Sequence, residues 1–157
     1  MDDAMNKTGR LKDLALLAMR MALAIVLIYA CLDKIANPEG FAASVKNYQF
    51  LPVILNNFFA MTMPWAELFC GILLLAGLFE RGAGLITSLM FLAFLIALTS
   101  ALLRGLDISC GCFHQAETET ITWLYLLRDL GLLILCLPIT RWGGGRFSLR
   151  ALVSRNR

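Results

Sequence analysis

Two cysteines and the single histidine of the sequence, Cys110, Cys112 and His114, lie in a short polar segment between two long apolar runs. Gly111 separates the two thiols, and its backbone freedom allows the turn that a Cys-x-Cys ring requires. A disulfide across so small a ring would be strained, and strain makes a disulfide easier to reduce. The pair is therefore typical of an exchangeable redox couple rather than of a permanent cross-link.

The residues around this pair are charged, so we expect the segment to face water. Arg104 and Asp107 precede the cysteines, and Glu117 and Glu119 follow them. An exposed thiol near positive charge is more reactive, because the charge favours the thiolate. Arg104 and protonated His114 would supply that charge as supporting residues. A buried packing role, common for free cysteine, fits these surroundings poorly.

A metal site is the alternative interpretation of the same segment. Cys110, Cys112 and His114 are three soft donors of the kind that bind zinc or Cu(I). The sequence offers no clear fourth ligand, so the redox couple is preferred and no metal is predicted there. A thiol-disulfide oxidoreductase or electron-transfer component is thus weighed against a metal-binding or assembly factor.

The composition is that of a membrane protein. Of 157 residues, 59% are hydrophobic and 16% are charged, whereas an average soluble domain is about 45 to 50% apolar. The net charge of +3 is small, and the positive residues gather at the two ends of the chain rather than in an aromatic-rich patch. Nucleic acid is therefore excluded as a partner, and the lipid bilayer is the first partner expected.

Four apolar runs are long enough to cross a bilayer core, which needs about 20 residues. We predict an all-α, single-domain bundle of four membrane-spanning helices, with an outer Cys-x-Cys loop at residues 104–120 and a basic tail at 141–157. The predicted spans are residues 14–36, 58–79, 83–103 and 121–139.

A short amphipathic helix is predicted on the membrane surface between the first two spans. Asn37-Pro38-Glu39 is typical of a helix start, and Phe41, Val45 and Tyr48 recur at helical spacing. Ser44, Lys46 and Asn47 are expected to face away from the apolar side. Asn56-Asn57 and Glu80-Arg81-Gly82 are predicted to be turns.

The distribution of basic residues predicts the orientation of the chain. Cytoplasmic segments carry an excess of Lys and Arg. Three basic residues fall on one side, Lys34, Lys46 and Arg104, and nine on the other: Lys7, Arg10, Lys12, Arg81, Arg141, Arg146, Arg150, Arg155 and Arg157. We therefore expect a multi-pass protein of the bacterial inner membrane with cytoplasmic N and C termini and the Cys-x-Cys loop in the periplasm, where thiols can be oxidised.

Four charged residues fall inside the predicted spans: Arg20, Glu67, Arg128 and Asp129. Such residues are costly in hydrocarbon and by default face the bundle interior with a partner. Because adjacent helical residues do not face each other, we expect Arg128 to pair with Glu67, and Asp129 with Arg20. Alternatively, these intramembrane residues form a site for the head group of a quinone, the one cofactor that the sequence suggests.

The other three cysteines, Cys31, Cys70 and Cys136, lie within apolar runs and are expected to pack in the core. Cys31 and Cys70 are both placed in the outer halves of their helices. They are therefore also a candidate relay of electrons between the outer couple and the bilayer. A bridge would require Cα atoms within about 7 Å.

Several motifs of the chain together carry a resemblance to a known family. They are Tyr29-Ala30-Cys31-Leu32-Asp33-Lys34-Ile35, Asn37-Pro38, Pro64-Trp65-Ala66-Glu67, Arg104-Gly105, Cys110-Gly111-Cys112-Phe113 and Arg128-Asp129. The chain is similar to the MauE branch of the DoxX-like membrane proteins over nearly all of its length between Arg20 and Leu133. The resemblance implies a four-helix membrane protein associated with redox processes, acting beside a thioredoxin-like periplasmic partner in maturing a disulfide-rich dehydrogenase subunit for methylamine utilisation. Cys31 and His114 stand where the family pattern suggests glycine.

Overall fold

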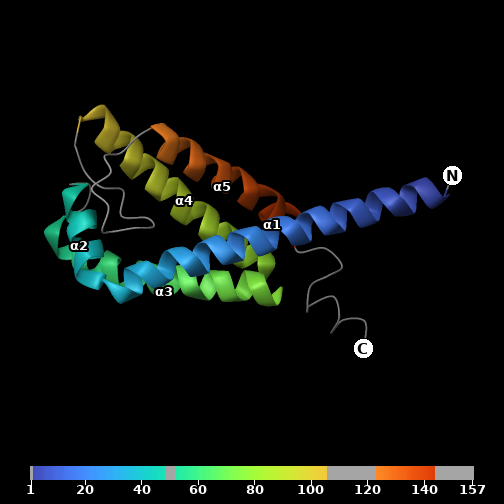
Figure 1. The fold of residues 1–157 in the computed structure, drawn as a ribbon, viewed down its shortest axis with the longest axis horizontal. Coiled ribbons are helices and arrows are strands. Elements are labelled where there is room, and N and C mark those ends of the chain that lie inside the picture. Colours follow the sequence, from blue (N-terminus) through green and yellow to red (C-terminus); the bar gives the residue numbers. More distant parts are fainter. Residues whose placement is uncertain (1, 49–51, 106–122, 144–157) are drawn as a thin grey trace.

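A computed structural model of the chain describes residues 2–48, 52–105 and 123–143. These residues form five α-helices: α1 (Asp2–Ala36), α2 (Pro38–Asn47), α3 (Val53–Ala76), α4 (Glu80–Leu103) and α5 (Trp123–Trp142). All except α2 are long and apolar enough to cross a membrane. The described part of the chain is thus the predicted all-α bundle, without strands (Figure 1).

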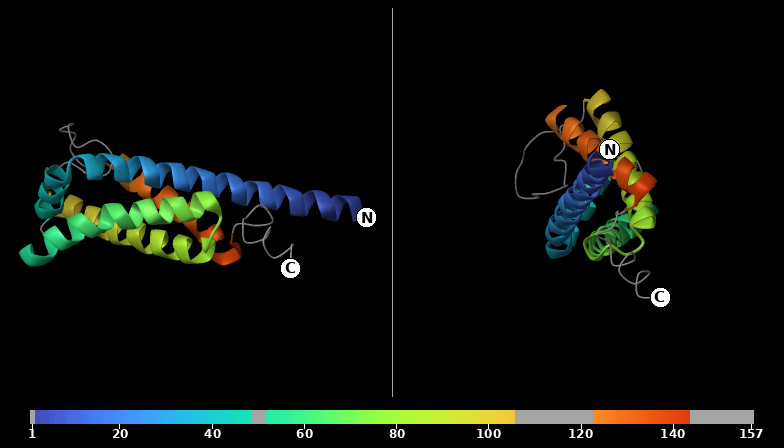
Figure 2. Two further views of the ribbon diagram at one scale, coloured as in Figure 1. Left: turned by 90° about the horizontal axis from the view of Figure 1, so that it is seen from below. Right: turned by 90° about the vertical axis from the view of Figure 1, so that its right-hand side faces the viewer.

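The bundle consists of two helix pairs. α1 packs mainly on α3, and α4 packs mainly on α5, while α3 and α4 meet along a smaller seam. α2 lies at one end of the bundle, and the turn between α3 and α4 lies at the other end (Figure 1). The N-terminal part of α1 extends beyond the other helices at this second end, where α5 also finishes (Figure 2).

The start of α2 follows the prediction. Asn37 is the N-cap, its side-chain oxygen accepts a hydrogen bond from the Gly40 backbone N–H at 3.0 Å, and Pro38 is the first helical residue. This arrangement satisfies one of the free N–H groups at the helix start. It allows the chain to turn directly from α1 into α2.

The apolar face of α2 is covered by protein rather than by a membrane surface. Phe41, Val45 and Tyr48 are buried, as their spacing predicted. Phe41 and Val45 pack against Ala60 and Met63 of α3. Ser44, expected to face away, is also buried, and its hydroxyl is satisfied within the helix because it donates to the Gly40 carbonyl at 3.0 Å.

Two predicted turns are helical in the structure. Asn56 lies inside α3, which begins at Val53, and its side chain is buried. Glu80 is the first residue of α4, and the turn lies just before it, where Gly77 and Phe79 have φ of 68° and 50°. Tertiary burial outweighs the turn preference of Asn, and Gly77 supplies the left-handed conformation that ends a helix.

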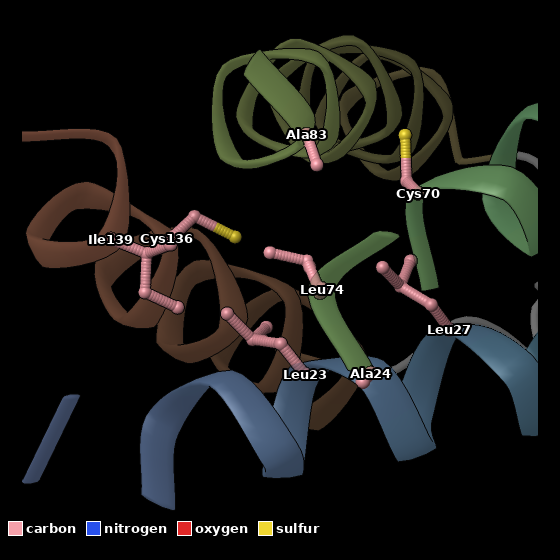
Figure 3. Close-up of a cluster of buried hydrophobic side chains, with 8 residues drawn as sticks. All are labelled: Leu23, Ala24, Leu27, Cys70, Leu74, Ala83, Cys136 and Ile139. Carbon is pink, nitrogen blue, oxygen red and sulfur yellow. The ribbon is translucent and has the colours of Figure 1, made fainter. Parts of the chain in front are cut away.

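Side chains from all four long helices form a core cluster near the α3–α4 turn (Figure 3). Two of the intramembrane cysteines, Cys70 and Cys136, belong to it, which confirms their predicted packing role. The cluster contains Leu23, Ala24, Leu27, Cys70, Leu74, Ala83, Cys136 and Ile139.

Candidate functional site

A small cavity with charged residues in its mostly apolar wall lies where the four long helices meet, closer to the α2 end. Its volume is about 30 Å³, which is room for about one water molecule or one ligand oxygen. Apolar side chains form most of its wall, with Met63 from α3 and Met90 from α4 among them. The charged residues that line it are Lys34 of α1, Glu67 of α3, and Arg128 and Asp129 of α5.

Lys34 and Glu67 form a buried ion pair that joins α1 to α3. The Lys34 ammonium lies 2.6 and 2.8 Å from the two carboxylate oxygens of Glu67, and the side chains are only 3% and 7% exposed. The ammonium also lies 5.3 Å from the Phe41 ring centroid and 5.7 Å from that of Phe94. The negative faces of the rings add to the stabilisation of this buried cation.

Arg128 and Asp129 form the second ion pair at the cavity. Arg128 Nε donates to Asp129 Oδ1 at 3.0 Å, and its Nη2 lies 2.9 Å from the same oxygen. The guanidinium lies 5.2 Å from the Tyr125 ring centroid. Asp129 is 3% exposed, whereas the Arg128 side chain is 31% exposed, so only the carboxylate is fully inside the bundle.

The predicted partners of these charges are wrong, although three of the four predicted residues do line one cavity. Glu67 pairs with Lys34 instead of Arg128, and Asp129 pairs with Arg128 instead of Arg20. Adjacent helical residues do not face each other, but the Arg128 side chain is long enough to fold along its own helix and reach Asp129. Lys34 was overlooked because a lysine two residues before the end of a span normally reaches water.

Arg20 takes part in a separate ion pair at the other end of the bundle. Its Nη1 lies 3.4 Å from Glu80 Oε1, and both side chains are nearly fully buried. The expectation that Arg20 meets a carboxylate on another helix is therefore confirmed, with a different partner. Fourteen residues separate Arg20 from Lys34, or about 21 Å along a helix. Arg20 is thus not part of the cavity.

The two cysteines of the candidate relay are buried free thiols. Cys31 lies five residues before the end of α1, next to α2, and its thiol donates to the Ile28 carbonyl at 3.0 Å. Cys70 lies six residues before the end of α3, and thus toward the α3–α4 turn. The expectation that both occupy the outer half is wrong, because Cys70 lies past the midpoint of α3, toward the end of the bundle opposite to Cys31. The relay itself stays a prediction.

Cys110, Cys112 and His114 lie outside the described residues, but the helices that flank them are described. The end of α4 and the start of α5 both lie at the α2 end of the bundle (Figure 1). Arg104, at the end of α4, donates to the Tyr48 carbonyl at 3.5 Å. Tyr48 also packs with Leu98 and Tyr125. Within the described ranges, no group of three candidate metal ligands occurs.

Comparison with known proteins identifies similar chains. A match to the family described as Methylamine utilisation protein MauE covers residues 12–141. The chain is 31% identical over 130 residues to Methylamine utilization protein MauE of Paracoccus denitrificans, covering 82% of this chain and 70% of that protein. It is 34% identical over 115 residues to the protein of the same name from Methylorubrum extorquens, covering 73% of this chain and 62% of that protein. No solved structure matches.

Proposed function

Because this chain belongs to the family of Methylamine utilisation protein MauE, we propose that it is a membrane thiol-disulfide redox protein serving methylamine utilisation. Cys110 and Cys112 form its exchanging couple on the periplasmic side of the inner membrane. Its partner is a thioredoxin-like protein, and the client is a disulfide-rich protein of the methylamine dehydrogenase type. Membership of the wider DoxX-like group remains a prediction.

The proposed reaction is a two-electron thiol-disulfide exchange. A thiolate of the partner attacks one sulfur of the Cys110–Cys112 disulfide, and the other cysteine leaves as a thiolate. The second thiol of the partner then breaks the mixed disulfide. The partner is oxidised to a disulfide, and the two electrons and two protons remain on Cys110 and Cys112.

The observation that carries this proposal is the location of the flanking helix ends. The chain enters and leaves the Cys-x-Cys segment at the α2 end, while the α3–α4 turn and the N-terminal end of α1 lie at the opposite end (Figure 1). The sequence count assigns the excess of basic residues to the side predicted to be cytoplasmic, the side of this opposite end. The couple would therefore be in the oxidising compartment, tethered to rigid helices.

Thiol labelling in intact cells tests the proposal. A membrane-impermeant maleimide should add two labels after treatment with a reductant and none after a mild oxidant. The variant with Cys110→Ser and Cys112→Ser is the matched control, because it retains the buried thiols Cys31, Cys70 and Cys136; it should take up no label in either state. Equal labelling of the natural chain in both states would contradict a redox couple. A stoichiometric zinc or copper adduct that blocks labelling would favour the metal alternative.

A further inference from the structure

An apolar groove lies on the lipid-facing side of the seam between α3 and α4. Its volume is about 330 Å³, and its walls include Phe59 from α3 and Ile86, Leu89 and Ala93 from α4. Ile86 and Leu89 are 47% and 57% exposed, so in a membrane this groove faces the acyl chains. Thr62 supplies the one hydroxyl of its lining, and that hydroxyl donates to the Phe58 carbonyl at 2.8 Å.

The groove and the cavity share two lining residues. Met63 and Met90 border both spaces. Methionine side chains are unbranched and change rotamer readily. These two flexible side chains therefore lie between the lipid-facing apolar groove and the cavity that Lys34 and Glu67 line.

The two spaces fit the two parts of an amphipathic ligand. The groove accepts an apolar chain and a planar ring, and the cavity has room for one oxygen atom. Lys34 has three ammonium protons, and its hydrogen bonds to Glu67 account for two of them. A carbonyl oxygen in the cavity would therefore lie beside a charged donor in a low-dielectric site, where such a hydrogen bond is strong.

The depth of the groove and the buried charges beside it together distinguish a quinone from a phospholipid. Residues 86–93 lie near the middle of α4, which spans Glu80–Leu103. An acyl chain could also fill the groove at this depth, but a phospholipid keeps its charged head group at the interface. Only a ligand whose polar group enters the hydrocarbon region can meet Lys34 and Glu67, which line the adjoining cavity. We propose that the groove and the cavity together bind a membrane-soluble quinone, with its isoprenoid tail in the groove and one carbonyl oxygen beside Lys34.

A redox role for this ligand depends on the proposed function, whereas binding does not. As an acceptor, the quinone would take the two electrons and two protons released when Cys110 and Cys112 form a disulfide, and would become a quinol. Quinone binding is therefore measured in the absence of any redox reaction. It is measured both in the natural chain and in a variant with Cys110→Ser and Cys112→Ser, which has no thiol couple.

Binding is measured with a radiolabelled short-tail ubiquinone and the full chain in phospholipid nanodiscs. We expect saturable binding that excess phospholipid or a tail hydrocarbon without a head group does not displace. Ala93→Phe fills the groove from an exposed helical position and should weaken binding about tenfold or more. Ala22→Phe is the matched control on an exposed face of α1, outside the groove, and should leave affinity unchanged.

The head-group contact is tested by replacing the ion pair as a unit. Lys34→Met combined with Glu67→Leu leaves no isolated charge and should weaken binding about tenfold, the effect of losing one hydrogen bond to a charged group. Non-saturable binding, displacement by phospholipid, or equal affinity in Ala93→Phe and Ala22→Phe would overturn the proposal. If the chain binds quinone but its labelling does not depend on redox state, only the thiol couple is refuted. If labelling depends on redox state but no quinone binds, only this binding site is refuted.

Discussion

The buried pair of Lys34 and Glu67 shows how much a single side chain depends on its partner. Each charge has lost most of its hydration, and the other charge compensates for that loss at 2.6 to 2.8 Å. Such a pair need not stabilise the fold more than two apolar residues would, but removal of one member leaves an uncompensated charge. The stability of the bundle should therefore respond very differently to single and double replacements.

We predict that Lys34→Met alone lowers the free energy of unfolding by about 3 to 5 kcal/mol, because Glu67 is left charged in an apolar interior. Adding Glu67→Leu should restore most of that loss. Circular dichroism during denaturant unfolding in detergent measures both. Lys46→Met on α2 is a useful comparison, because Lys46 is an exposed cation and its loss should cost little. If the double replacement costs as much as the two single ones added together, the pair does not couple as described.

At the scale of the helices, hydropathy predicted the four spans, and the Asn37-Pro38 start predicted the short helix between the first two. The periodicity of Phe41, Val45 and Tyr48 also predicted the buried face of α2. The errors occur at the turns and in the pairing of charges. Asn56 and Glu80 have side chains typical of turns and surfaces, yet both are buried by neighbouring helices. Such burial, like the pairing of Lys34 with Glu67, depends on how the helices are rotated and shifted relative to one another. The local sequence of a single helix does not determine that arrangement.

The contact between α1 and α3 depends on a glycine. A Cβ atom at Gly71 would lie 2.9 Å from Ile28 Cγ1 and 3.4 Å from the Ala24 carbonyl oxygen. We therefore predict that Gly71→Ala forces these helices apart and lowers the free energy of unfolding by about 1 to 3 kcal/mol. Gly131→Ala on α5 is the matched control, because a Cβ atom there meets nothing within 4 Å. It should be neutral or stabilising by roughly 0.5 to 1 kcal/mol. Equal unfolding midpoints for the two variants would show that the α1–α3 contact is not so close.

At the scale of the whole molecule, the buried charges divide the bundle into two regions. Arg20 and Glu80 join α1 to α4 at the end that holds the α3–α4 turn, while Lys34 and Glu67 join α1 to α3 at the α2 end. The core cluster of Leu23, Cys70 and Cys136 lies toward the turn. Polar chemistry is thus concentrated at the end where α4 finishes and α5 starts, beside the helix ends that flank the Cys-x-Cys segment.

The buried position of Lys34 also strengthens the predicted orientation of the chain. This lysine was counted among the three basic residues at the α2 end, but its charge is paired with Glu67 inside the bundle. Of the three basic residues counted on that side, Lys46 of α2 and Arg104 therefore remain, against nine counted on the other side. The asymmetry that places basic segments in the cytoplasm is accordingly larger than the sequence count indicated.

We therefore predict that the C terminus lies in the cytoplasm and that residues 106–122 lie in the periplasm. Alkaline phosphatase folds only where its disulfides form, outside the cytoplasm, whereas common green fluorescent protein reporters fluoresce after cytoplasmic folding. A C-terminal fusion should consequently give fluorescence without phosphatase activity, and a phosphatase fusion truncated after residue 116 should be active. Each fusion is the control for the other, because their fusion points are separated by α5, which is predicted to cross the membrane once. Phosphatase activity from the C-terminal fusion would reverse the orientation and place the Cys110–Cys112 couple in the reducing cytoplasm, where a periplasmic partner has no access to it.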